Sequence, residues 1–464
     1  MAFKCRYVIL FLIPTLLAAQ EKSEFQQIME RLDRLEQENR DLAAEVRSLR
    51  AELAASTGAA NPQPAATTAN AGNQSAPAQA PPAQPTIDER VAVQERRIEE
   101  QAQSKVEASQ KFPVSLTGMV LFNGFLNGKA NNGQEDPTTA SLSGATAYGG
   151  GSLGQSVLGL LFQGPHIFGG GQINGNLYMD FFGGTSSSLN HLVRLRVASV
   201  EFDWAHTSLM VGQEKPIIAP REPNSLAQVG VSPLTGSGNL WLWNPQVRLE
   251  QRFSFGDQAG LRAQVGVYQT SEPSSVNRLG EYASTVSTDR PSIEGRFEFW
   301  RQFSKGARIE IAPGFHESST HVAGASVSSN LFTVDWLIQP VSKLQLTGTF
   351  FTGQNAAGVG GIRQGFSIFG NQPVGIGATG GWAQFSILAT QRLSFNFYGG
   401  QESDSPRDLL NGDIARNLTY AGNIIYRLGP NVLLGLEASQ LRTTYFQLPR
   451  LFNDHYDLAV AYLF

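Results

Sequence analysis

Arginines recur at spacings of two and four residues through the last three quarters of the chain, and carboxylates alternate with them. Residues two apart in a strand share one face of the sheet. Arg keeps its charge, and its planar guanidinium can bind a carboxylate or phosphate through two hydrogen bonds. Arginines that line a pore favour anions. The arginines predicted to line such a face are Arg194, Arg196, Arg248, Arg252, Arg262, Arg296, Arg308, Arg392 and Arg427. The acids on the same faces are Asp180, Glu250, Glu294, Glu298, Glu310, Asp335, Glu437 and Asp457.

These arginines have a second interpretation, in which they pair with acids of the same wall and only stiffen it. This interpretation suits Arg296, which stands between Glu294 and Glu298, and Arg308, which stands two residues before Glu310. Two pairs have fewer acids close by in sequence. We therefore expect these pairs to contact a solute first: Arg194 with Arg196, and Arg248 with Arg252.

The elements that must position these residues are short alternating strands. Sixteen segments of the region from 112 to 464 alternate apolar and polar residues. They are 114–126, 155–163, 171–182, 191–203, 207–214, 241–254, 259–269, 292–303, 306–315, 329–339, 342–352, 381–389, 391–400, 415–428, 431–442 and 454–464. The last segment places Tyr456, Leu458, Val460, Tyr462 and Phe464 on one face. If Phe464 faces lipid, the same parity turns the arginines inward.

The links between these segments alternate in length. Links such as 164–166, 205–206 and 429–430 are tight, whereas those after most odd strands are long and rich in Gly, Ser and Asn, including 316–328. Outer-membrane barrels have short periplasmic turns and long outer loops. A soluble sandwich, the other fold considered, has no reason to put its long loops at one end. We predict an all-β transmembrane barrel of sixteen antiparallel strands, located in the bacterial outer membrane and in contact with its lipid.

Four further zones precede this barrel. Residues 1–19 have the basic start, apolar run and small residues of a signal peptide. Residues 21–54 predict a coiled coil, 55–86 an Ala/Pro-rich disordered linker, and 87–111 a helical segment. The single cysteine, Cys5, lies in the signal, so we expect no disulfide and no thiolate site.

The coiled coil has a 3-4 apolar spacing, which favours self-association over a lone amphipathic helix. An even number of strands returns both ends of the barrel to the periplasm, so we expect the helix there. Its predicted core is Ile28, Leu32, Leu35, Asn39, Leu42, Val46, Leu49 and Leu53. Val at a with Leu at d favours dimers, whereas Asn39 at an a position can fix the register of other oligomers.

Other function classes find little support in the sequence. The six histidines are scattered without a nucleophile or metal-ligand pattern, so we expect no enzyme, no metal and no cofactor. A formal net charge of −4 gives no reason to expect nucleic acid. The pattern predicts a porin for small hydrophilic, anionic solutes. The alternative is a structural tether that is anchored by the periplasmic coiled coil and has a filled lumen.

The run from Arg194 to Asp203, followed by Leu209-Met210-Val211-Gly212-Gln213, resembles the DcaP-like porins. The resemblance implies a periplasmic coiled coil before a trimeric, sixteen-stranded barrel that passes small anions, dicarboxylates especially. By the same resemblance the link 215–240, the third outer loop, would fold inward as a constriction loop carrying Lys215, Arg221 and Glu222. An outward surface loop is the alternative. The chain departs from the family after Gln213, where Glu214-Lys215-Pro216 follows, so selectivity at this loop stays open.

Overall fold

The computed structural model describes residues 114–141, 146–184, 191–269, 291–303, 306–322, 325–370 and 372–464. The predicted signal peptide, coiled coil, linker and helical segment lie outside these residues. No helix in the described ranges has the length and apolar character needed to cross a membrane.

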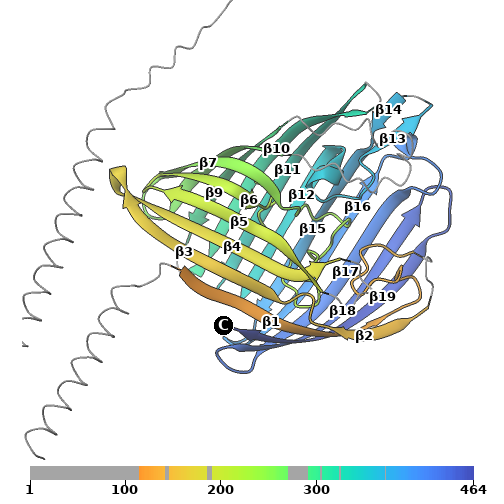
Figure 1. Cartoon of the computed structure of the whole chain (residues 1–464), viewed down its shortest axis with the longest axis horizontal. Helices are drawn as coiled ribbons and strands as arrows, with labels where there is room; N and C mark the ends of the chain where they lie inside the picture. The colour runs from red at the N-terminus through yellow and green to blue at the C-terminus, as the bar shows by residue number, and fades with distance from the viewer. Residues whose placement is uncertain are drawn as a thin grey trace, which may run out of the picture. The chain divides into compact units, whose positions relative to one another are not determined.

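The described residues form a closed antiparallel β-barrel (Figure 1). Its first half consists of β1 (Val114–Asn127), β2 (Tyr148–Ser152), β3 (Val157–Ile167), β4 (Gly171–Gly183), β5 (Leu192–Asp203), β6 (Thr207–Glu214), β7 (Asn244–Ser254), β8 (Ala259–Tyr268) and β9 (Ser292–Gln302). Its second half consists of β10 (Arg308–Val322), β11 (Ala325–Val341), β12 (Leu344–Gln354), β15 (Gly377–Leu388), β16 (Leu393–Asp404), β17 (Ile414–Arg427), β18 (Val432–Tyr445) and β19 (Leu451–Leu463).

The sixteen predicted strands are confirmed, with boundaries shifted by a few residues. β2 and β3 both pair with β1, at its two ends, and so form one interrupted barrel strand. The first and last strands close the barrel, with Met119 opposite Leu463 and Asn127 opposite His455. Two further strands, β13 (Phe366–Phe369) and β14 (Gln372–Gly375), form a separate hairpin.

One predicted outer loop is wrong. The link 316–328 is strand for most of its length, because β10 and β11 remain paired from Arg308 with Gln339 as far as Val322 with Ala325. Although Ser318, Ser319 and Thr320 follow one another, a continuous backbone ladder between the two strands holds this region as a tall hairpin. The polar composition had suggested a loop.

The faces follow the predicted parity. Tyr456, Leu458, Val460, Tyr462 and Phe464 are exposed on the outside, whereas His455, Asp457 and Ala459 are buried inside. Large apolar side chains also cover the outside of the other strands, among them Val247, Phe297, Phe350 and Phe397. An apolar exterior with a polar interior is the pattern of a transmembrane barrel.

Candidate functional site

The segment 215–240 lies inside the barrel, and hydrogen bonds connect it to strands around the wall. Its backbone amides at Ile218 and Asn224 donate to Glu294 of β9 and Gln384 of β15. On the other side, Asn123 of β1 donates to the carbonyl of Leu226, and Asn417 of β17 to that of Gly236. Apolar contacts add to this, since Leu226 packs with Leu121, Ala459 and Ala461. An outward surface loop, the alternative considered above, does not fit these contacts.

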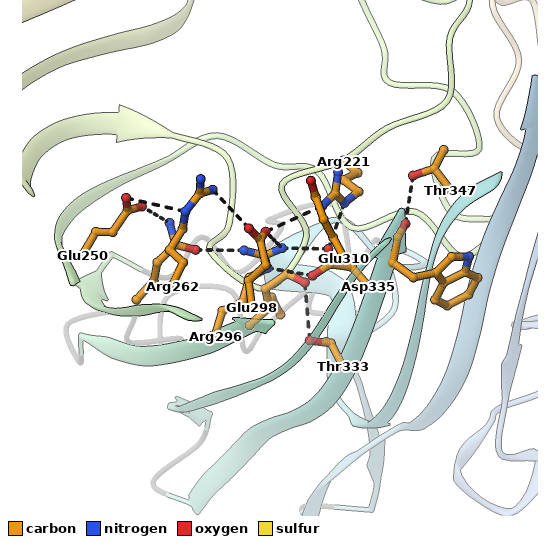
Figure 2. Close-up of polar contacts among 12 residues, drawn as sticks. Arg221, Glu250, Arg262, Arg296, Glu298, Glu310, Thr333, Asp335 and Thr347 are labelled. Atoms are coloured by element: carbon orange, nitrogen blue, oxygen red, sulfur yellow. Dashed lines mark hydrogen bonds and ion pairs between the residues drawn. The ribbon is translucent and has the colours of Figure 1, made fainter. Parts of the chain in front are cut away.

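Arg221 ties this segment to a network of charges on β9, β10 and β11 (Figure 2). Its Nε donates to Asp335 Oδ1 at 3.0 Å, and its Nη2 donates to Glu310 and lies 3.6 Å from Glu298. Arg296 approaches the same acids from the wall, with its Nε 2.7 Å from Asp335 Oδ2 and its Nη2 2.7 Å from Glu298 Oε2. Both arginines therefore share carboxylates, and Arg296 is almost fully buried.

The network continues along the wall. Arg262 bridges Glu250 at 3.7 Å and Glu298 at 3.6 Å, as Figure 2 shows. Arg308 pairs with Glu310, and Arg252 with Asp203 at 2.5 Å. The contacts thus support pairing with the acids of the wall for four of the arginines: Arg252, Arg262, Arg296 and Arg308. Arg252 has two partners, because its Nη1 also lies 3.6 Å from Glu250 on its own strand and Asp203 belongs to β5.

Arg194 and Arg196 form a second cluster at the β4–β5 pair. Both point inward because residues two apart on β5 share one face. The strand also has a bulge here, since Tyr178 pairs with Val197 and Met179 with Leu195, which leaves Arg196 as the extra residue. Arg194 binds Asp180 through Nε at 3.1 Å and Nη2 at 2.6 Å. Arg196 Nη1 lies 3.7 Å from the same carboxylate. Asp180, which faces both arginines from β4, is thus their ion-pair partner.

Aromatic rings hold this arginine pair in place. The guanidinium carbons of Arg194 and Arg196 lie 5.3 Å and 4.8 Å from the ring centroid of Trp243, and Arg194 also lies 5.4 Å from that of Phe182. Cation–π contacts of this kind fix a guanidinium without neutralising it. The remaining Arg194 contact is a hydrogen bond to the carbonyl of Gly230, in the inward segment.

Lys215 and Glu222 complete the charges near this pair. Lys215 Nζ lies 2.8 Å from Glu222 Oε1, and Glu222 also accepts from Ser232 at 2.7 Å. Burial acts to raise the pKa of Glu222, but Lys215 and the hydrogen bond of Ser232 outweigh it and hold the pKa below its usual value. Three cations (Arg194, Arg196, Lys215) thus share two carboxylates (Asp180, Glu222) in ion pairs, and the Glu214 carboxylate accepts from the backbone amide of Lys215 at 3.0 Å.

Two cavities meet the arginine pair from opposite sides. The first, about 600 Å³, is lined by Phe182, Arg194 and Val231 together with residues of the long loops. The second, about 340 Å³, is lined by Arg196, Lys215, Val229 and Trp243 together with residues near the start of β1. Arg194 and Val231 line the first cavity, and Arg196 and Val229 line the second. The hydrogen bond between Arg194 and the carbonyl of Gly230 therefore lies at the boundary between the two cavities.

The other predicted arginines stand apart. Arg248 has no carboxylate within ion-pair distance in the described part of the chain, and its neighbours across the sheet are Met210 and Gly266. Arg392 and Arg427 lie at the short-turn end of the barrel, where Arg427 donates to the carbonyl of Pro430 at 2.7 Å. Sequence reasoning missed Trp243 and Gln155. Gln155 accepts from the amides of Val229 and Gly230, and no local pattern marks a single aromatic or amide residue for such a role.

No family model and no curated protein matches this chain in sequence. Solved structures do match in fold. The outer membrane channel DcaP of Acinetobacter baumannii superposes with a TM-score of 0.62 at 15% identity, over 76% of this chain and 97% of the channel. An anion-selective porin from Comamonas acidovorans superposes with a TM-score of 0.51 at 13% identity, over 76% and 99% of the two chains. The predicted resemblance to the DcaP-like porins is therefore confirmed at the level of the fold.

Proposed function

We propose that this chain is an outer-membrane porin through which small hydrophilic solutes diffuse passively, with a preference for anions such as dicarboxylates. The observation that carries the proposal is the position of Arg194 and Arg196. They stand at the boundary between two cavities of the lumen, and Lys215 adds a third cation to the lining of one of them. A solute that passes from one cavity to the other meets these guanidinium groups.

The charge has the strength to discriminate between ions. One unit charge 4 Å from a solute ion contributes about 1 kcal/mol in bulk water and about 4 kcal/mol at the lower effective dielectric near a protein. Because 1.4 kcal/mol is about a factor of ten in an equilibrium constant, even the lower value separates anions from cations several-fold. Salt in the lumen screens this attraction.

Structural neighbours support the same proposal. Two structural neighbours are an outer membrane channel and an anion-selective porin. On the resemblance to the DcaP-like porins we further propose a homotrimer in the outer membrane, with the coiled coil at 21–54 in the periplasm. Lys215, Arg221 and Glu222 would serve the constriction, Arg221 as its anchor to the wall. Arg248, Arg392 and Arg427 would contribute charge along the path.

Reversal potentials in a KCl gradient across a planar bilayer test this proposal. We expect chloride to permeate better than potassium in the wild type, and Arg196→Gln to reduce the ratio several-fold. Arg301→Gln is the matched control, because Arg301 lies on the outward face of β9 beside Phe303. A cation preference, or the same ratio in Arg196→Gln as in the wild type, contradicts the proposal. A barrel that inserts but never conducts favours the tether.

A further inference from the structure

Three arginines gather on the outer wall of the barrel, at the ends of β17, β18 and β19 that carry the longer loops. Arg416 is exposed near the start of β17, Arg442 lies near the end of β18, and Arg450 is exposed just before β19. Their neighbours Asn417, Leu441 and Thr443 are buried inside, so the strand parity turns Arg416 and Arg442 outward.

This position is unusual for the wall. In the described strands the remaining outward arginine is Arg301, which lies at the opposite end of the barrel. None of the three guanidinium groups has a carboxylate within ion-pair distance in the described ranges. The nearest outward acid in the register, Asp454, instead accepts from Gln440 at 2.7 Å. The three positive charges are therefore uncompensated.

The three arginines are neighbours on this outward face. Arg416 stands directly opposite Thr444 in the β17–β18 ladder, and Arg442 precedes Thr444 by two residues on the same face. Arg450 Nε donates to Thr444 Oγ1 at 3.1 Å. Side chains directly or diagonally opposite in a ladder are about 5–8 Å apart, and like charges at such positions destabilise a sheet. A counter-ion among them would remove this repulsion.

Neutral groups fix the side chain of Arg442 without pairing its charge. Its Nε donates to Gln440 at 2.7 Å and its Nη2 to the Tyr420 hydroxyl at 2.5 Å. Its guanidinium carbon also lies 4.9 Å from the Tyr420 ring centroid and 5.8 Å from that of Phe452. These contacts leave Nη1 free to donate. An arginine fixed by neutral groups loses little further freedom when it binds an anion.

The position of the three arginines relative to the membrane interface indicates which anion they can bind. Tyr420, Phe452 and Tyr456 are exposed aromatic side chains on the same wall, and such residues mark the membrane interface in barrels. Arg416 lies four residues beyond Tyr420 toward the long loops, about 13 Å along a strand. That level is occupied by lipid headgroups and not by acyl chains.

We propose that Arg416, Arg442 and Arg450 form a binding site for a phosphate group of an outer-leaflet lipid. Guanidinium groups bind phosphate through paired, charge-assisted hydrogen bonds. These three lie close together on the outward face, since Arg416 is diagonally opposite Arg442 in the ladder and Arg450 contacts Thr444 beside them. The inference rests on the proposed outer-membrane location, since that location puts the long-loop end at the outer leaflet.

Native mass spectrometry of the detergent-solubilised full chain tests the site, with lipid A, which carries two phosphates, as the probe and inorganic phosphate as a second probe. We expect the triple variant Arg416→Gln/Arg442→Gln/Arg450→Gln to bind lipid A at least tenfold more weakly than the wild type, and Arg301→Gln to bind it equally well. Circular dichroism and heat-modified gel mobility check that the triple variant is folded.

Equal binding of lipid A by the wild type and the folded triple variant overturns the inference. A similar loss in Arg301→Gln overturns it too, because binding would then follow total charge. If inorganic phosphate binds the three arginines as tightly as lipid A does, the site takes a free anion and the lipid assignment is wrong. Channel conductance in the triple variant tests the porin proposal separately, since the site lies outside the lumen.

Discussion

Replacing Arg221 by glutamine removes the charged anchor between the inward segment 215–240 and the wall. Arg221 contacts three carboxylates, those of Glu298, Glu310 and Asp335, and its side chain is 18% exposed. Without it, the acids keep Arg296 and Arg308 as partners, but the segment loses its ionic connection to β10 and β11.

The size of the effect follows from this partial compensation. Removing one partner of a buried ion pair typically costs about 3–5 kcal/mol. Arg296 also binds Asp335 and Glu298, so these acids keep a partner in Arg221→Gln. We therefore expect the loss of anchoring free energy to be at the lower end of this range, about 3 kcal/mol, and less if water reaches the site. At about 1.4 kcal/mol for each factor of ten, the ratio of released to anchored segment rises about 100-fold.

Amide hydrogen exchange measures this release locally. The amides of Ile218 and Asn224 donate to wall side chains in the anchored segment, so we expect both to exchange about 100-fold faster in Arg221→Gln. Arg262→Gln is the matched control, because Arg262 belongs to the same network but contacts Glu250 and Glu298 of the wall. The amides of the segment should be unaffected there.

Two results would refute this reasoning. The first is unchanged exchange of these amides in Arg221→Gln, which would mean that apolar contacts such as those of Ile218 and Leu226 hold the segment without the charge. The second is equal acceleration in Arg262→Gln, which would mean that the segment responds to the network as a whole and not to its own anchor.

Three further predictions concern the lumen. Burial, and to a smaller extent the charge of Asp457, raises the pKa of Asp136 well above 3.8. The folded state therefore loses stability as the pH rises above 3.8. Asp136→Asn should raise the melting temperature at pH 8 and leave it unchanged below pH 3.8. Gly238 has a φ of +97°, and a Cβ there would lie 2.3 Å from the carbonyl oxygen of Gly381. In urea unfolding, Gly238→Ala should therefore lower the stability of the barrel by about 1–3 kcal/mol. Gly256→Ala, at an open turn with a φ of +71°, should lower it less. Asp180→Asn removes the carboxylate shared by Arg194 and Arg196, so the chloride-to-potassium permeability ratio should rise; a fall would contradict the assignment of these arginines to the path.

The barrel could be predicted from the sequence because its signals are local and repeated. Alternation within each strand fixes the faces, and the parity counted back from Phe464 turned the arginines inward. The tall β10–β11 hairpin was not predictable in this way. Its Ser and Thr residues suit a loop as well as a strand, and the pairing that decides between them joins residues on two strands.

The sequence identified the inward arginines of the site, but not most of the acids with which they pair. Sequence spacing identified Arg296 and Arg308 as paired with neighbouring acids, since those acids lie on the same strand. Asp180 and Asp203 escaped notice as partners, because each reaches its arginine from another strand and the register between strands is not visible in a single sequence. The position of Trp243 against Arg194 and Arg196 depends on the path of the segment 215–240, which no local pattern specifies.

The reversal potential of the single channel, compared between the wild type and the double variant Arg194→Gln/Arg196→Gln in a KCl gradient, tests the central claim most directly. We expect chloride preference in the wild type and its loss in the double variant, with the barrel still inserted and conducting. A preference that stays the same in both proteins contradicts the claim that these two arginines select the solute.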